Sequence, residues 1–370
     1  MKTVCKLNEC AGCMACVDIC NKNAISVIDQ LSHYNAVIDE NKCVKCSSCF
    51  RVCQSNNPSE FKKPLKWNQG WTNDENLREI CSSGGAAAEL STAFIKSGGV
   101  VCSCVFENGE FKFGIAEKAE QVNRFTGSKY VKSNPKGIYK IINNTLKKGI
   151  KVLFIGLPCQ VAALNNYVEE KNKENLFTAD LICHGTPSPK LLEAFLNQYG
   201  VSLNQLHDIK FRKKARFQIN ADDTYLVSKG VSDKYSIAFL NSLIYTENCY
   251  NCKYSQLERV SDITLGDSWG SELEFEEQKK GISLILCQTE KGKQLVNSAD
   301  LTLKEVDIDK AIANNHQLER SSAKPKGIEE FFIDIGKNRS FNKSVSKQLP
   351  KQCFRQNVKE MLIKLKIIKR

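Results

Sequence analysis

Several features that would assign a chain to a common class of protein are missing from this sequence. There is no run of about 18 apolar residues, so we expect no membrane-spanning helix. The opening stretch, MKTVCKLNEC, has neither an apolar core nor a small-residue cleavage site, which argues against a secretory signal. We find no helix-turn-helix, no RNP-like strand and no G-x-G-x-x-G fingerprint. We therefore expect a cytoplasmic protein that binds no nucleic acid and has no Rossmann nucleotide site.

Cysteine, by contrast, is abundant, with 18 among 370 residues. Without a secretory signal, clustered thiols indicate metal or redox chemistry more than disulfides. The length favours two or three domains, and 42% hydrophobic with 25% charged residues is typical of a globular protein. The net charge of +12 favours an acidic redox protein, such as ferredoxin or flavodoxin, as partner. A surface of solvated lysines without a partner is the alternative.

Two cysteine-rich runs share the spacing C-x2-C-x2-C-x3-C, one from Cys10 to Cys20 and one from Cys43 to Cys53. In bacterial-type ferredoxins the fourth cysteine of such a run ligates the other cluster. We therefore predict two 4Fe-4S clusters. The first is assigned to the first thiol set, Cys10, Cys13, Cys16 and Cys53. The other is assigned to the second thiol set, Cys20, Cys43, Cys46 and Cys49.

The runs depart from the ferredoxin pattern in one respect, because Asn21 and Gln54 stand where a proline usually follows the fourth cysteine. This change removes some loop rigidity but no ligand. Zinc is the alternative metal, but zinc sites use two C-x2-C pairs with a longer spacer and four ligands per ion. Cys5 lies outside both runs, and we interpret it as a structural or incidental thiol.

The pattern around the runs predicts an α+β ferredoxin-like two-cluster module over residues 1–56. Short β-like runs at 24–28 and 34–38 would form a hairpin under the clusters. Residues 57–76 are polar, contain two prolines and lack periodicity, so we expect a linker there.

An α/β core is expected over residues 77–320, with an N-terminal part (77–150) and a C-terminal part (151–320). Two apolar strands, at 151–156 and 176–183, are each followed by a turn and a helix. Such strand–turn–helix units predict a mixed, largely parallel sheet that helices cover on both faces.

Single cysteines follow the two apolar strands, in GLPCQ and CHGTPSP. Because ligands of open α/β sheets bind beyond the carboxyl ends of strands, Cys159 and Cys183 lie where chemistry is expected. CYNC adds Cys249 and Cys252, which brings the number of thiols to the four that a third cluster needs. Buried, inert cysteines are the alternative.

CSSGG, which begins at Cys81, precedes a helix expected from about Gly85 to Lys96. Ser82 or Ser83 can cap this helix, and the glycines would let a phosphate approach its N-terminus. A plain cap without a ligand is the alternative.

Six stretches in order resemble one family: CSSGG, GSKYVKS, GLPCQVAAL, DLICHGTPSP, CYNCKY and DITLGDSWG. Residues 77–290 are thereby similar to the coenzyme F420 hydrogenase/dehydrogenase beta subunit family, whose relatives include archaeal deazaflavin-reducing subunits and a plant chlorophyll reductase. The resemblance implies FAD and a 4Fe-4S cluster in the core, the cluster held by the core thiol set, Cys159, Cys183, Cys249 and Cys252. It also implies flavin contacts from Ser82, Ser83, Gly84, Gly85, Ser128 and Lys129.

These features predict an iron–sulfur flavoprotein oxidoreductase. Electrons would pass from the ferredoxin-type clusters through the core cluster to FAD, which links one-electron and two-electron chemistry. The acceptor would be a small organic substrate or deazaflavin, and the reverse direction is equally allowed. The alternative is a non-catalytic electron-transfer subunit of a larger redox complex.

Two residues are catalytic candidates. His184 follows a predicted cluster ligand and belongs to the residue type that titrates in the right range for a proton donor, although a structural hydrogen bond to a cluster sulfur or a backbone carbonyl is the favoured role. Asp267, at the end of DITLGD, would orient the flavin or the substrate, or else cap a turn. Lys129 would neutralise a flavin phosphate or remain a solvated lysine.

Two basic segments receive less specific predictions. FRKKARF (211–217) is expected to be an exposed hairpin, with a grip on an acidic partner or anionic substrate as the alternative. Residues 321–370 are expected to form a helical, basic C-terminal extension, a surface helix or a peripheral membrane contact. Four cysteines receive no role: Cys102, Cys104, Cys287 and Cys353.

Overall fold

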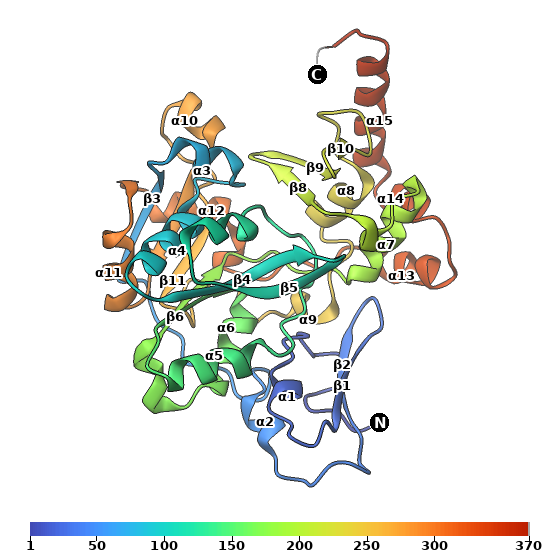
Figure 1. Ribbon diagram of the computed structural model, residues 1–370. Helices are drawn as coiled ribbons and strands as arrows, with labels where there is room; N and C mark the ends of the chain where they lie inside the picture. Colours follow the sequence, from blue (N-terminus) through green and yellow to red (C-terminus); the bar gives the residue numbers. More distant parts are fainter. Residues whose placement is uncertain (369–370) are drawn as a thin grey trace.

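The computed structural model describes residues 1–368 and has an eight-stranded sheet at its centre (Figure 1). From edge to edge the strands are β13 (Leu301–Lys304), β3 (Lys66–Thr72), β12 (Ser283–Cys287), β11 (Ile263–Asp267), β7 (Leu176–Leu181), β6 (Val152–Gly156), β4 (Val100–Glu107) and β5 (Glu110–Ala116).

The sheet is mixed, as predicted, but the expectation of a largely parallel sheet is wrong. Only β11–β7, β7–β6 and β6–β4 are parallel, and the other four neighbours pair antiparallel. Two parallel neighbouring strands need a long crossover connection, usually a helix. In this sheet only the central strands are connected in that way. β4 and β5 instead form the hairpin that Asn108-Gly109 predicts, with both turn residues at positive φ.

The expectation that residues 57–76 form an irregular linker is also wrong, because β3 lies within them, between β12 and β13. Its sequence, KWNQGWT, has no aliphatic residue and therefore gives no strand signal. Its buried polar side chains are paired instead: Ser268 Oγ donates to Gln69 Oε1 at 3.0 Å, and Thr72 Oγ1 donates to Glu89 Oε2 at 3.0 Å.

Helices cover both faces of the sheet. On one face, α4 (Ala86–Lys96) and α11 (Glu290–Ser298) pack against it through residues such as Leu90, Phe94 and Val296. On the other face lie α5 (Ile138–Lys147) and α6 (Pro158–Tyr167). The short helices α3 (Glu75–Ile80), α10 (Phe275–Lys280) and α12 (Ile308–Asn314) complete this part.

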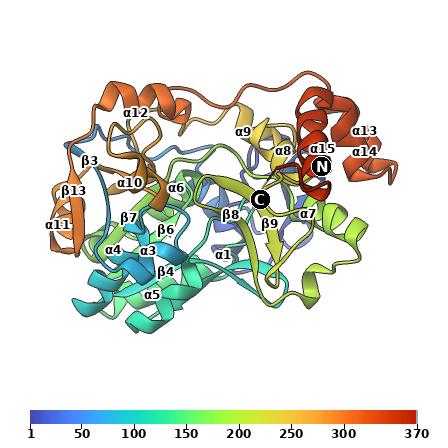
Figure 2. The same ribbon diagram turned by 90° about the horizontal axis from the view of Figure 1, so that it is seen from above.

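The N-terminal module docks on α5 and α6, on the face opposite α4 (Figures 1 and 2). It contains the predicted hairpin, β1 (Ile25–Asp29) and β2 (Tyr34–Ile38), and the short helices α1 (Ala15–Asp18) and α2 (Ser48–Val52). The Asp18 carboxylate accepts hydrogen bonds from Gly137 N at 2.7 Å and Tyr139 N at 3.3 Å, at the start of α5. The module is thus anchored on the core rather than tethered to it.

A second hydrophobic core lies beside the sheet. It joins a three-stranded sheet, β8 (Ile209–Lys213), β9 (Arg216–Ala221) and β10 (Thr224–Tyr225), to five helices: α7 (Pro189–Leu196), α8 (Lys234–Leu240), α13 (Ile328–Gly336), α14 (Phe341–Gln348) and α15 (Pro350–Lys364). Residues 321–368 are therefore helical, as expected, but Phe331, Phe341 and Cys353 belong to this core, so the segment is not an appendage. None of the helices in residues 1–368 is long and apolar enough to cross a membrane.

Candidate functional site

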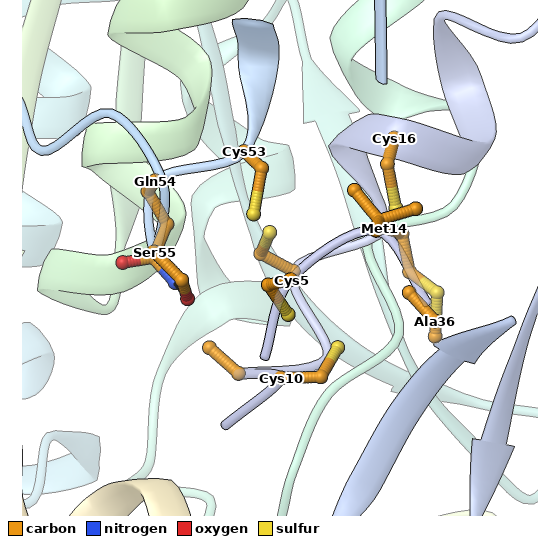
Figure 3. A pocket seen from close by; sticks show the side chains of 11 residues that line it. Cys5, Cys10, Met14, Cys16, Ala36, Cys53, Gln54 and Ser55 are labelled. Atoms are coloured by element: carbon orange, nitrogen blue, oxygen red, sulfur yellow. Dashed lines mark hydrogen bonds between the residues drawn. The ribbon is translucent and has the colours of Figure 1, made fainter. Parts of the chain in front are cut away.

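The first thiol set surrounds one small cavity in the N-terminal module (Figure 3). Cys10, Cys13, Cys16 and Cys53 all line it, so the fourth cysteine of the second run does join the first three of the first run. All four side chains are buried, and burial raises the pKa of the Cys13 and Cys16 thiols. The backbone N–H of Gly12 donates to Cys10 Sγ at 3.4 Å. A buried ring of thiols with an aimed N–H fits an iron–sulfur cluster.

The second thiol set lies nearer the surface. Cys46 is exposed, and Cys20, Cys43 and Cys49 are half-buried. Burial raises the pKa of Cys49, and the nearby thiols of Cys20 and Cys43 raise it further. The fourth cysteine of the first run, Cys20, therefore lies with cysteines of the second run, as predicted. Cys49 in turn raises the pKa of Cys16, which places the two thiol sets side by side.

The core thiol set also converges. Cys159 lies in the first turn of α6 and Cys183 follows β7, while Cys249 lies in α9 (Glu247–Tyr250) and Cys252 just beyond it. Burial raises the pKa of Cys183, and the other three thiols raise it further, so all four are neighbours. Thr246 Oγ1 lies 3.5 Å from Cys249 Sγ, and Asn248 Nδ2 donates to this sulfur at 3.7 Å.

The sulfurs of these sets are not packed as a single ion would require. Within residues 1–368, no three or more His, Cys, Asp or Glu side chains are close enough together to bind one metal ion. A tetrahedral zinc site brings its sulfurs to within about 4 Å of one another, since each Zn–S bond is about 2.3 Å. The side chains of residues 1–368 therefore form no preformed zinc site.

Lys132 and Tyr254 lie between the first thiol set and the core thiol set. Buried Lys132 donates to Ala11 O at 3.1 Å. Burial raises the pKa of Cys159, and the positive charge of Lys132 partly opposes this rise. Tyr254 Oη donates to Gln54 Oε1 at 2.6 Å, so Gln54, which replaces the usual proline, ties the module to the core. The three thiol sets therefore form a series in which the first set neighbours both the second set and the core set.

The predicted flavin residues are brought together only in part. Ser128 N donates to Ser82 Oγ at 2.8 Å, which joins two of the predicted stretches. Ser83 Oγ donates to Ile282 O at 2.9 Å, and α4 begins after Gly85 without a side-chain cap, so the expected serine cap is wrong. Gly85 itself occupies the N-cap position, with a φ of 85°. This left-handed backbone conformation is one that serine rarely adopts.

Gly84 and Lys129 have roles within the protein itself. A Cβ on Gly84 would lie 2.5 Å from Gly70 O and 2.7 Å from Ser283 N, so this glycine lets the loop pack against the sheet. Lys129 Nζ donates to the carbonyls of Phe125, Thr126 and Gly127 at 2.9, 2.9 and 3.2 Å. Burial lowers the Lys129 pKa. Lys129 is therefore not a solvated lysine, and its three donors already have partners.

Arg212 is the site residue that sequence reasoning missed. FRKKARF does form the predicted hairpin, β8–β9, but the Arg212 side chain is only 3% exposed. Arg212 Nη2 donates to Asp267 Oδ1 at 2.7 Å and to Ser82 O at 3.1 Å. The pairing of β8 with β9 shifts between Lys210 and Arg212, and this irregularity turns the side chain inward.

His184 lies in the same region, and burial lowers its pKa to about 4. Its Nδ1 accepts a hydrogen bond from Gln317 Nε2 at 2.8 Å, and the same amide nitrogen contacts His316 Nε2 at 2.7 Å. His184 therefore makes a structural hydrogen bond, but with the Gln317 amide and not with the cluster sulfur or backbone carbonyl expected from the sequence.

Two buried polar atoms in this region have no partner among residues 1–368: the donor Arg212 Nε and the acceptor Gln317 Oε1. Buried polar atoms without a partner are rare in folded proteins, and those that occur often face a bound group or an ordered water. Both atoms lie on residues next to His184 and Asp267. A polar ring system such as a flavin fits this donor and acceptor.

Comparisons with known proteins agree with these features. Residues 149–311 match the family described as the C terminus of the coenzyme F420 hydrogenase/dehydrogenase beta subunit, and residues 9–57 match the 4Fe-4S dicluster domain. No curated protein matches the chain. One similar solved structure is a xenon-derivatised F420-reducing NiFe hydrogenase complex from Methanosarcina barkeri. It has 17% identity and a TM-score of 0.47 over 69% of this chain and 91% of that one.

The family predicted from the motifs is therefore confirmed. The chain is an iron–sulfur electron-transfer protein that is related, through residues 149–311, to the coenzyme F420 hydrogenase/dehydrogenase beta subunit family and carries a 4Fe-4S dicluster domain over residues 9–57.

Proposed function

We propose that the chain is an oxidoreductase in which electrons pass from two 4Fe-4S clusters of the N-terminal module through a core cluster to FAD and on to a small organic substrate. The observation that carries this proposal is the order of the three thiol sets. Cys49 of the second set lies near Cys16 of the first set. Cys13 of the first set lies near Cys159 of the core set. When bound, the clusters supply one-electron transfer and the flavin couples it to two-electron chemistry.

The second thiol set is the proposed entry for electrons. Cys46 is exposed, and the neighbouring Val44 and Phe50 are 60% and 52% exposed. Lys42, Lys45 and Arg51 surround them, all exposed. An apolar patch within a positive rim fits an acidic ferredoxin or flavodoxin, because complementary charge speeds encounter and short apolar contacts complete the docking.

The region of Arg212, His184 and Gln317 is the proposed flavin and substrate end. Arg212 is held by Asp267, so its guanidinium is fixed in position and its Nε can donate to a bound ring or anion. Gln317 is held by His184 and can accept through Oε1. Both candidates named from the sequence, His184 and Asp267, thus act as positioning residues in this proposal.

The proposal is tested by anaerobic purification of the full chain, followed by iron, sulfide and flavin analysis. We expect about twelve irons per chain, from three clusters of about four, and one noncovalent FAD. A substrate screen with reduced ferredoxin as donor then tests the reaction. A preparation without flavin that joins a stable complex and turns over no small molecule would instead support the non-catalytic electron-transfer subunit.

Arg212→Gln is expected to lower the affinity for flavin by about tenfold or more, because a charged hydrogen bond contributes about 1.5–3 kcal/mol. Arg216→Gln is the matched control, since Arg216 lies exposed on the same hairpin. Flavin retention and the dissociation constant, measured by quenching of flavin fluorescence, check the prediction. Equal affinities for the two variants would remove Arg212 from the flavin site.

A further inference from the structure

A fifth thiol lines the cavity of the first thiol set. Cys5 was interpreted from the sequence as structural or incidental, but the structure places it on the same cavity wall as Cys10 and Cys53. Its side chain is only 6% exposed, so the thiol faces this cavity rather than solvent. In Figure 3 the side chains of Cys5, Cys10 and Cys53 converge on one space.

The backbone holds Cys5 in this position. Val4 N donates to Ala36 O at 2.9 Å, so the N-terminal segment runs along β2. Asn56 Nδ2 donates to Val4 O at 2.9 Å, which ties this segment to the chain just after Cys53. Cys5 is therefore fixed beside Cys53 from two sides, and its place does not depend on the thiol itself.

The surroundings of Cys5 differ from those of the buried cysteines Cys287 and Cys353. These two belong to cores built mainly of aliphatic and aromatic side chains, where a thiol serves as a small hydrophobe. Cys5 instead faces, across one cavity, two thiols that are proposed to bind two different irons, because each iron of a 4Fe-4S cluster takes one cysteine. This arrangement gives the first site one more thiol than a cluster needs.

We propose that Cys5 is an iron-ligating thiol of the first cluster site, interchangeable with Cys10 and Cys53. The proposal rests on the proposed function, since it requires a cluster in that cavity. In the exchange one Fe–S bond to Cys10 or Cys53 breaks and one to Cys5 forms. The proton that Cys5 releases is taken up by the departing thiolate, so no oxidant or reductant is consumed.

The test is the iron and sulfide content of the full chain, purified without oxygen, together with the electron paramagnetic resonance spectrum of the reduced protein. Cys10→Ala is expected to keep about twelve irons, with a changed spectrum for the first cluster. Cys5→Ala with Cys10→Ala is expected to hold about eight. Cys16→Ala is the matched control, because Cys16 lines the same cavity but lies apart from Cys5 in Figure 3.

Equal iron contents and spectra for Cys10→Ala and the double variant would overturn the proposal, as would equal losses in Cys10→Ala and Cys16→Ala. If Cys10→Ala does not fold, Cys53→Ala alone and combined with Cys5→Ala give the same comparison. The iron content of the wild-type chain separates a failure of the proposed function from a failure of the Cys5 proposal. Fewer than about twelve irons there would count against the proposed function, and through it against this site.

Discussion

Replacing Cys252 by alanine is expected to lower the iron content from about twelve to about eight per chain, because a 4Fe-4S cluster seldom survives without one of its four thiolates. Cys252 lies beside Cys249, and the charge of each raises the pKa of Cys159. The loss should therefore be confined to the core site. Electron delivery from the N-terminal clusters to the proposed flavin should fall to background, since the core set lies between them in the proposed path.

The measurement is iron and sulfide analysis of the anaerobically purified variant, followed by the rate of flavin bleaching with reduced ferredoxin. Cys287→Ala is the matched control, because Cys287 is 2% exposed in β12 and belongs to no thiol set. It should keep about twelve irons and the wild-type bleaching rate. A Cys252→Ala protein with full iron content would show that the core thiols hold no cluster.

The cysteine sites could be predicted from the sequence because their geometry is encoded locally. A C-x2-C-x2-C run fixes three thiols on one short loop, whatever surrounds it. Cys159 and Cys183 were predicted from a rule almost as local, since each follows an apolar strand and parallel strands end at the same edge. The match of residues 9–57 to the dicluster domain confirms the class of site that this spacing indicated.

The parts that sequence reasoning missed depend on contacts between distant segments. β3 carries polar side chains whose burial is compensated by Ser268 and Glu89, about 200 and 17 residues away. Arg212 turns inward at an irregularity in the β8–β9 pairing, and a basic run gives no sign of this. Cys5 joins the first thiol set because the N-terminal segment pairs with β2.

A second large effect is expected at the buried ion pair that supports the core thiol set. Arg259 and Asp180 are 1% and 0% exposed in their side chains. Arg259 Nε lies 3.2 Å from Asp180 Oδ2, and Nη2 donates to Asp180 Oδ1 at 3.2 Å. The guanidinium also donates to the carbonyls of Tyr254 and Leu181, which flank Cys252 and Cys183. This pair therefore fixes both segments that carry core thiols.

Arg259→Met is expected to lower the free energy of unfolding by about 3–5 kcal/mol at neutral pH, because it leaves a buried carboxylate unpaired. Burial already raises the Asp180 pKa above 3.8, and Arg259 opposes that shift. Without Arg259 the native pKa rises further, so native Asp180 binds its proton more tightly than the unfolded chain does. The deficit should then shrink as the pH falls through the native pKa toward 3.8 and grow as the pH rises.

Anaerobic urea unfolding at neutral pH and at about pH 5, followed by tryptophan fluorescence, measures this effect and its pH dependence. Lys2→Met is the control, since Lys2 forms an exposed pair with Glu40 and such substitutions change stability by less than about 0.5 kcal/mol. Adding Asp180→Asn to Arg259→Met should recover part of the loss, because it removes the unpaired charge. If Arg259→Met unfolds at the same urea concentration as Lys2→Met, the pair contributes nothing to the stability of the core, and the segments around Cys183 and Cys252 must be fixed by other contacts.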